Sequence, residues 1–218
     1  FVTQLLAPGN VDYRMGFITT DWHRLVGYNY IDNNTQNPSI EAALLVDGIG
    51  TSGGANEAGL AEVHYALEYF RDNNEFIRSD AELVIIYVSD EPDHSPFPHT
   101  YYENEYLNYK PADKIKTYAV IGDYPSGCSN TFGNLPINAQ FGSGYYELVS
   151  HFGGQWYSIC DIDWGGNMTN LAADISIRSH FYLEKPDPII STIEVYVNGQ
   201  SVLSGWTYNE SENKTFLS

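Results

Sequence analysis

The sequence is poor in positive charge and has no long apolar run. It carries 10 Lys and Arg against 28 Asp and Glu, which gives a formal net charge of −18. An excess of negative charge this large opposes binding to nucleic acid and to anionic lipid. No apolar run approaches the roughly 20 residues that a membrane-spanning helix needs. We therefore expect no nucleic-acid partner and no membrane insertion in this segment.

Cysteine is also scarce, since only Cys128 and Cys160 occur in 218 residues. Neither lies in a Cys-x-x-Cys pattern, so neither a zinc site nor a dithiol redox site is indicated. We expect one disulfide between them, because each follows or ends one of two neighbouring predicted strands. A disulfide favours an extracellular or cell-surface location, with the periplasm as a further option. Two unrelated buried thiols are the alternative.

The composition is that of a folded chain with one main domain. Apolar residues make up 43% of the sequence and aromatic residues 15%, which is enough to fill a core. Strand and helix patterns alternate through residues 1–183, which predicts an α/β fold with a mostly parallel sheet and helices on both faces. Over residues 184–218 the pattern becomes antiparallel, and Asn198-Gly199 is a strong hairpin signal.

Hydrophobic periodicity and turn residues predict the elements of the first segment. Strands are expected at residues 13–19, 83–88, 115–121 and 156–160. Helices are expected at residues 57–70 with Asn56 as the N-cap, near 101–107, at 145–152 and at 167–177, and residues 39–48 form either a short helix or a half-buried segment. Residues 124–144 are expected to form a long glycine-rich loop, and residues 1–6 the end of an amphipathic helix already under way.

The predicted strand at residues 83–88 and the polar residues after it are the most informative stretch. Its six apolar residues are typical of a strand covered on both faces. Oxygen-bearing side chains follow at once, at Ser89, Asp90, Glu91, Asp93 and Ser95. In α/β sheets, ligands bind beyond the carboxyl ends of the strands. Oxygen ligands without cysteine favour Mg²⁺ or Ca²⁺, whereas an acidic surface turn is the plain alternative.

Two other segments are expected to reach the same edge of the sheet. Thr19, Thr20 and Asp21 end the first predicted strand, and residues 48–56 form a glycine-rich loop before a predicted helix. Polar and aromatic side chains at such an edge suit contact with a partner. The residues predicted to make that contact are Asp21, Trp22, Glu91, Asp93 and Ser95.

Four segments have the order and spacing of a known family. They read D-Y-R-M-G-F-I-T-T-D (12–21), G-G-A-N-E-A-G-L (53–60), L-V-I-I-Y-V-S-D-E (83–91) and G-G-Q-W-Y-S-I-C (153–160). Together they resemble a bacterial von Willebrand factor A-like domain, over residues 1–183. The resemblance implies a doubly wound sheet that binds another macromolecule through a divalent cation. The C-terminal hairpin resembles the β extension that follows such domains in some bacterial surface proteins.

The resemblance also implies a cation site with three parts. Asp90 matches the aspartate that follows the family's fourth strand. Residues 53–56 read Gly-Gly-Ala-Asn where many members have Gly-Gly-Thr-Asn, so Thr51, Ser52 or Glu57 would supply the missing oxygen. The family's Asp-x-Ser-x-Ser loop does not occur in this sequence. Either that loop lies upstream of Phe1, or the site is degenerate and binds no metal.

The favoured function is non-enzymatic binding to another protein or a surface glycan, as an adhesin or an assembly component. The alternative is a structural subunit of an extracellular assembly that needs no cation. A hydrolase using Ser52 is the weakest hypothesis, because no histidine stands in a context that marks it as the base. Asp93 and His94 with His99 are a candidate transition-metal set, although histidines in proline-rich loops are usually solvated.

Overall fold

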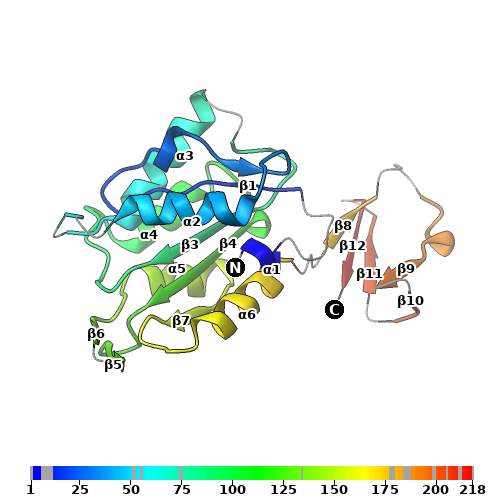
Figure 1. Cartoon of the computed structure of the whole chain (residues 1–218). Coiled ribbons are helices and arrows are strands. Elements are labelled where there is room, and N and C mark those ends of the chain that lie inside the picture. Colours follow the sequence, from blue (N-terminus) through cyan, green and yellow to red (C-terminus); the bar gives the residue numbers. More distant parts are fainter. Residues whose placement is uncertain are drawn as a thin grey trace. The chain divides into compact units, whose positions relative to one another are not determined.

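The structure is a computed structural model, shown in Figure 1. It describes residues 2–5, 12–50, 53–54, 56–73, 76–133, 135–176, 180–183, 188–197, 200–204, 206–210 and 213–217. Contacts divide the chain into two compact units, Phe1–Ala173 and Asp174–Ser218. The first unit is mixed α/β with a three-stranded parallel sheet, and the second contains small antiparallel sheets.

The helices are α1 (Val2–Leu5), α2 (Pro38–Ile49), α3 (Gly59–Asn73), α4 (His99–Tyr106), α5 (Tyr145–Phe152) and α6 (Trp164–Ser176). The strands of the first unit are β1 (Arg14–Met15), β2 (Ile31–Asp32), β3 (Leu83–Val88), β4 (Ile115–Ile121), β5 (Cys128–Phe132), β6 (Leu135–Ala139) and β7 (Trp156–Ser158). Those of the second unit are β8 (His180–Tyr182), β9 (Val195–Val197), β10 (Gln200–Val202), β11 (Trp206–Asn209) and β12 (Lys214–Leu217). Short 3-10 turns lie at Val26–Tyr28, Ala112–Lys114 and Ile190–Thr192.

The parallel sheet has the strand order β3-β4-β7. Leu83 pairs with Ile115 at one end of the β3–β4 ladder, and Val88 pairs with Val120 at the other. The strands predicted at residues 83–88 and 115–121 are therefore confirmed. The core against this sheet is built from β3, β4 and the helices α3, α4 and α5. Both faces of β4 are covered, because Tyr118 on one face and Ala119 on the other are fully buried.

A chain of buried hydroxyls links the sheet to two helices. Tyr87 of β3 and Tyr106 of α4 are both buried, and their hydroxyl oxygens lie 2.8 Å apart. Tyr106 donates to the carbonyl of Leu60 in α3, at 3.0 Å. Because Tyr106 uses its one proton there, Tyr87 must be the donor to Tyr106. Burial raises the pKa of both phenols well above the ordinary tyrosine value, so both stay neutral.

This arrangement predicts an asymmetry between two phenylalanine variants. Tyr106→Phe leaves the Tyr87 hydroxyl buried without an acceptor, and we expect a loss of about 1–3 kcal/mol in the free energy of unfolding. The double variant Tyr87→Phe/Tyr106→Phe removes the stranded donor and should be more stable than Tyr106→Phe alone. Urea denaturation of the wild type and the two variants measures the difference. A double variant that is less stable than Tyr106→Phe would contradict the donor assignment.

The segment predicted as a glycine-rich loop instead contains a β-hairpin. β5 and β6 pair antiparallel, from Cys128 opposite Ala139 to Phe132 opposite Leu135. Gly133 at the turn has a φ of 61°, which glycine adopts without strain. Polar residues and Pro136 in these strands hide the strand signal in the sequence, so the loop prediction for residues 124–144 was wrong over this part.

The predicted disulfide is confirmed. Cys128 at the start of β5 is bonded to Cys160, which follows β7, and their Cα atoms lie 6.1 Å apart. Asn130 also donates from Nδ2 to the carbonyl of Cys160, at 2.8 Å. The hairpin is thus attached to the segment that follows the third strand of the sheet.

Removing the disulfide should therefore destabilise the first unit. The bond joins cysteines separated by 32 residues. A closed loop of that length stabilises a fold by about 3–4 kcal/mol in the chain-entropy account. We expect the variant Cys128→Ser/Cys160→Ser to lose stability of that order in a denaturant titration, and the wild type to gain two protons by mass on reduction. An unchanged mass would show that the bond is absent in solution.

Two further predictions needed correction near the N-terminus. The strand expected at residues 13–19 is reduced to β1, which pairs antiparallel with β2 over two residues. It ends there because the carbonyl of Phe17 accepts from Val26 N at 2.8 Å, and the chain then turns between Thr19 and Trp22. The helix expected from residue 57 begins at Gly59, so Asn56 is not at its N-cap position.

The second unit consists of antiparallel strands, as the alternating pattern predicted. One sheet has the order β11-β12-β8, and β9 pairs with β10 so that Val197 lies opposite Gln200. The turn residues Asn198 and Gly199 lie outside the described residues. β8 pairs with β12 and so belongs to this unit, although it precedes the domain boundary predicted after residue 183. No helix within the described ranges is long and apolar enough to cross a membrane.

Candidate functional site

The carboxyl end of β3 is joined to the loop before α3. The last sheet bond of this strand runs from Ser89 N to the carbonyl of Val120, at 3.1 Å. The Ser89 side chain is then buried, and its hydroxyl accepts from Glu91 N at 3.0 Å and donates to the carboxylate of Glu57. Glu57 lies two residues before α3. The loop before α3 therefore contacts the carboxyl end of β3, although the two are far apart in the sequence.

A third segment reaches the same place. The carboxylate of Asp21 accepts from Gly54 N at 2.6 Å, and Ala58 N donates to the carbonyl of Thr20 at 3.0 Å. A Cβ atom at Gly54 would lie only 2.8 Å from Asp21 Oδ1, so a larger residue here would displace the Asp21 carboxylate from its present position. The structure therefore brings together the three segments that the sequence predicted to meet at this edge.

Four carboxylates gather where these segments meet, and we call them the carboxylate rim: Asp21, Glu57, Asp90 and Glu91. Burial raises the pKa of Glu57 above its usual range, while the hydrogen bond from Ser89 acts in the opposite direction. The charges of Asp90, Glu91 and Asp21 raise it further. The negative charges are therefore close enough to repel one another, and a cation would relieve that repulsion.

Asp93 and Ser95, which the sequence predicted to contact a partner, accept hydrogen bonds from the first turn of α3. Asp93 Oδ1 accepts from Leu60 N at 3.1 Å, and Ser95 Oγ accepts from Ala61 N at 2.9 Å. The hydroxyl of Tyr145 accepts from Gly59 N at 3.3 Å. The opening amides of a helix have no partner within it, so these side chains take the place of a local N-cap. Carboxylate charge at this end also suits the helix dipole.

Removing the Asp93 carboxylate should weaken the start of α3. We expect Asp93→Ala to lower the free energy of unfolding by about 0.5–2 kcal/mol, the usual range for loss of a capping side chain. Asp93→Asn keeps an oxygen acceptor and serves as the matched control. Hydrogen exchange of the Leu60 and Ala61 amides reports the local effect. Unchanged exchange in Asp93→Ala would show that the cap does not operate in solution.

Comparison of the wild type with Asp93→Asn at different pH values tests the electrostatics of the cap. Burial is the main cause of a raised pKa for Asp93, although hydrogen bonds from Leu60 and Ser95 oppose it. The folded state then holds the proton more tightly than the unfolded state, so this group's contribution to stability rises as pH falls from neutral through the raised pKa. Asp93→Asn lacks the titration. Wild type should therefore gain stability relative to Asp93→Asn on acidification, measured by urea denaturation.

A polar depression of about 490 Å³ adjoins the rim. One side is formed by Asp90 and Glu91, and the other by the β5–β6 hairpin and the residues just before and after it. The lining residues are Asp90, Glu91, Ser126, Gly127, Cys128, Ser129, Asn138, Ala139 and Gln140. Gln140 N donates to the carbonyl of Asp90 at 2.8 Å, which holds the two sides together. Hydroxyl, amide and carboxylate groups thus line this open depression.

The remaining predicted site residues have different positions. Trp22 is 54% exposed next to Asp21, so its ring is accessible to a partner. Thr51 and Ser52 lie outside the described residues. The hydrolase hypothesis rests on Ser52, so the structure does not test it. Within the part of the chain that the structure describes, no three His, Cys, Asp or Glu side chains are placed to hold a metal ion.

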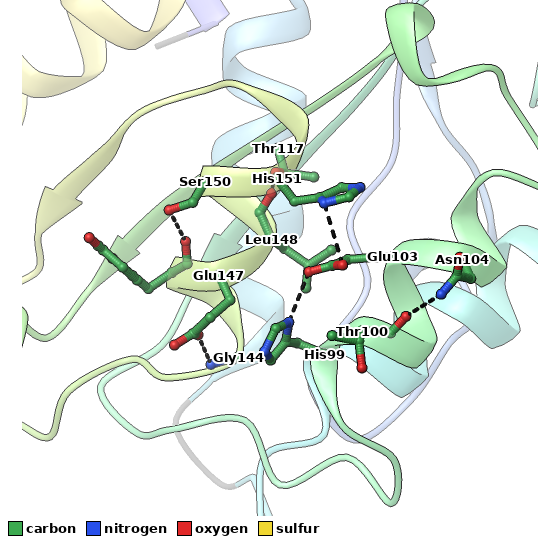
Figure 2. Close-up of polar contacts among 11 residues, drawn as sticks. His99, Thr100, Glu103, Asn104, Thr117, Gly144, Glu147, Leu148, Ser150 and His151 are labelled. Atoms are coloured by element: carbon green, nitrogen blue, oxygen red, sulfur yellow. Dashed lines mark hydrogen bonds and ion pairs between the residues drawn. The ribbon is translucent and has the colours of Figure 1, made fainter.

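A second polar cluster joins α4 to α5 (Figure 2). The carboxylate of Glu103 lies between two imidazoles, 2.9 Å from His99 Nδ1 and 3.4 Å from His151 Nδ1. Thr117 of β4, also drawn in Figure 2, donates to the carbonyl of Leu148 in α5 at 2.8 Å. His99, a candidate for a metal set with Asp93 and His94, therefore contacts Glu103 within α4, and His151 of α5 links the two helices through the same carboxylate.

Two residues of the site were not among the predicted site residues. Ser89 was noted only as part of the polar run after the strand, and Tyr145 has no signal in its own neighbourhood because its contact with Gly59 joins residues 86 positions apart.

Searches against protein families, curated proteins and solved structures find no match for this chain.

Proposed function

We propose that the chain is a non-enzymatic binding domain of an extracellular or cell-surface bacterial protein, with a doubly wound von Willebrand factor A-like fold over residues 1–183. The carboxylate rim and the exposed Trp22 contact another protein or a surface glycan. The observation that carries this proposal is the meeting of three separate segments at the carboxyl end of β3, through the contacts of Ser89 with Glu57 and of Asp21 with Gly54. The disulfide is compatible with that location.

In the cation-dependent form of the proposal, Mg²⁺ or Ca²⁺ binds at the rim. Carboxylate and hydroxyl oxygens are the ligands that these hard cations prefer. Asp90 and Glu57 are the residues that would hold the ion, together with Thr51 or Ser52, and an acidic group of the partner would complete the shell. The mutual repulsion that raises the pKa of Glu57 gives the ion a favourable electrostatic position.

Calorimetric titration tests the cation. We expect heat on adding Mg²⁺ or Ca²⁺ to the wild type and its loss in Asp90→Asn, because that variant removes one of the charges that attract the ion. Asp47→Asn is the matched control, since Asp47 is an exposed aspartate on α2. Equal heats in Asp90→Asn and Asp47→Asn would remove the rim as the cation site. Absence of heat in the wild type would contradict the cation-dependent form, and only partner binding without a cation would remain of the proposal.

A structural subunit of a surface assembly is the second candidate. It is favoured by exposed apolar side chains on α2, where Ile40 and Leu44 are each 62% exposed. Apolar groups exposed along one helix are typical of surfaces that pack against another protein. Sedimentation of the chain at increasing concentration separates the two candidates, because a building block should self-associate and a monomeric binding domain should not.

A further inference from the structure

Four aromatic side chains pack together next to the β5–β6 hairpin, and we call them the aromatic stack: Tyr124, Phe141, Tyr146 and Trp156. Tyr124 is 59% exposed, and its ring lies over that of Tyr146 with the centroids 5.2 Å apart and an interplanar angle of 18°. Phe141 meets both rings edge-on, at 5.3 and 5.6 Å. Trp156 of β7 supports Tyr146 from within the unit, at 6.2 Å. The exposed ring of Tyr124 therefore rests on a base that reaches back to the sheet.

The chain places the exposed ring beside the polar depression. Tyr124 lies in a tight turn that is closed by Gly127 N, which donates to the carbonyl of Asp123 at 2.7 Å. Ser126 lies in the same turn and lines the depression. Two residues of chain span at most about 7 Å, so the backbone of Tyr124 is within that distance of the wall. Phe141 directly follows the last lining residue on the other side of the hairpin.

Described residues form both walls of the depression. The walls follow β3 and β4, so the depression lies beyond the carboxyl ends of these two paired strands and not on the unpaired edge of β3. Gln140 N donates to the carbonyl of Asp90 between the walls, and the bond from Cys128 to Cys160 anchors the hairpin. Walls that are already positioned lower the cost of binding a ligand.

The depression offers neutral hydrogen-bonding groups in addition to its two carboxylates. Four exposed side chains supply them: Ser126, Ser129, Asn138 and Gln140. Hydroxyl and amide side chains both donate and accept hydrogen bonds, and the hydroxyl groups of a sugar do the same. A lysine or arginine side chain only donates, so it would leave the amide and hydroxyl protons of the wall without an acceptor. The lining therefore matches a sugar better than a basic peptide.

We propose that the depression and the exposed ring of Tyr124 form a binding site for a neutral glycan of two or more hexose units. The face of an aromatic ring is apolar and carries partial negative charge, which suits the C–H groups of a pyranose ring. The polar groups of the depression then fix the orientation of the sugar hydroxyls. This inference rests on the proposed function as a binding domain, and it names the partner and gives it a place separate from Trp22.

Charge narrows the class of glycan. Asp90 and Glu91 line the depression, and none of the described residues that line it is basic. The whole chain carries a net charge of −18. A uronic or sialic acid would bring its own carboxylate against these charges, so acidic glycans are disfavoured. A neutral glycan avoids this repulsion, and its hydroxyls can donate to the two carboxylates.

Calorimetric titration of the full chain with sugars tests the proposal. The probes are cello-, malto- and galactan oligosaccharides of two to four units, with galacturonate oligosaccharides of the same length as the acidic control. EDTA is present throughout, so that a cation at the rim does not contribute. We expect at least one neutral series to bind, and the acidic series to bind at least about tenfold more weakly.

Matched variants locate the sugar. Tyr124→Ala should weaken binding by about tenfold, whereas Tyr124→Phe keeps the ring and should bind as the wild type does. Tyr28→Ala is the control, because Tyr28 is 89% exposed elsewhere in the first unit. Asn138→Lys places a long charged side chain in the depression and should abolish binding. The same change at Asn104, which is exposed on α4, should leave binding intact.

Three results would overturn the proposal. The first is absence of binding across the neutral series, and the second is equal binding to Tyr124→Ala and Tyr28→Ala. The third is binding of an arginine-rich peptide that depends on Tyr124 while no sugar binds, which would make the site a peptide site. Sugar binding that is lost in Trp22→Ala and kept in Tyr124→Ala would place the glycan at the rim. In that case this inference fails and the proposed function stands.

Discussion

The first turn of α3 depends on side chains that come from the loop after β3. Leu60 and Ala61 donate their amides to Asp93 and Ser95, 33 and 34 residues further along the chain. The contact of Ser89 with Glu57 fastens the same two segments from the other side. Because the helix terminus and the strand terminus share these bonds, neither can shift without the other. These bonds also fix the position of the carboxylate rim. Glu57 is one of the bonded residues, and Asp90 directly follows Ser89 in the sequence.

The buried tyrosines extend the same joint into the core. Tyr145 of α5 bonds the first amide of α3, and Tyr106 of α4 bonds the carbonyl of Leu60 in the first turn. Each phenol fills apolar space with its ring and satisfies a backbone group with its hydroxyl. Three helices and the central sheet are therefore linked by hydrogen bonds through the first turn of α3.

Elements whose signal is local could be predicted from the sequence, whereas those set by distant contacts could not. β3 and β4 are continuous apolar runs, and their bounds were predicted correctly. α5 was predicted as well, because it has an apolar face and ends at Gly153, whose φ of 67° suits glycine. The start of α3 was missed because its capping groups lie more than 30 residues away, and the β5–β6 hairpin because its strands are polar. At the site, the meeting of the three segments followed from strand order, but the inward role of Asp93 and Ser95 did not.

The disulfide stabilises only one side of the site. The hairpin side depends on the bond, whereas the acidic side does not. Cys128 lines the polar depression and is bonded to Cys160, while Asn130 adds a hydrogen bond to the carbonyl of the same residue. The contacts that position Glu57 and Asp21 involve no cysteine. In a reducing environment the hairpin wall of the depression would therefore lose its covalent anchor, whereas the acidic edge beside it would keep its geometry. Formation of the disulfide thus completes one side of this surface and leaves the other as it already was.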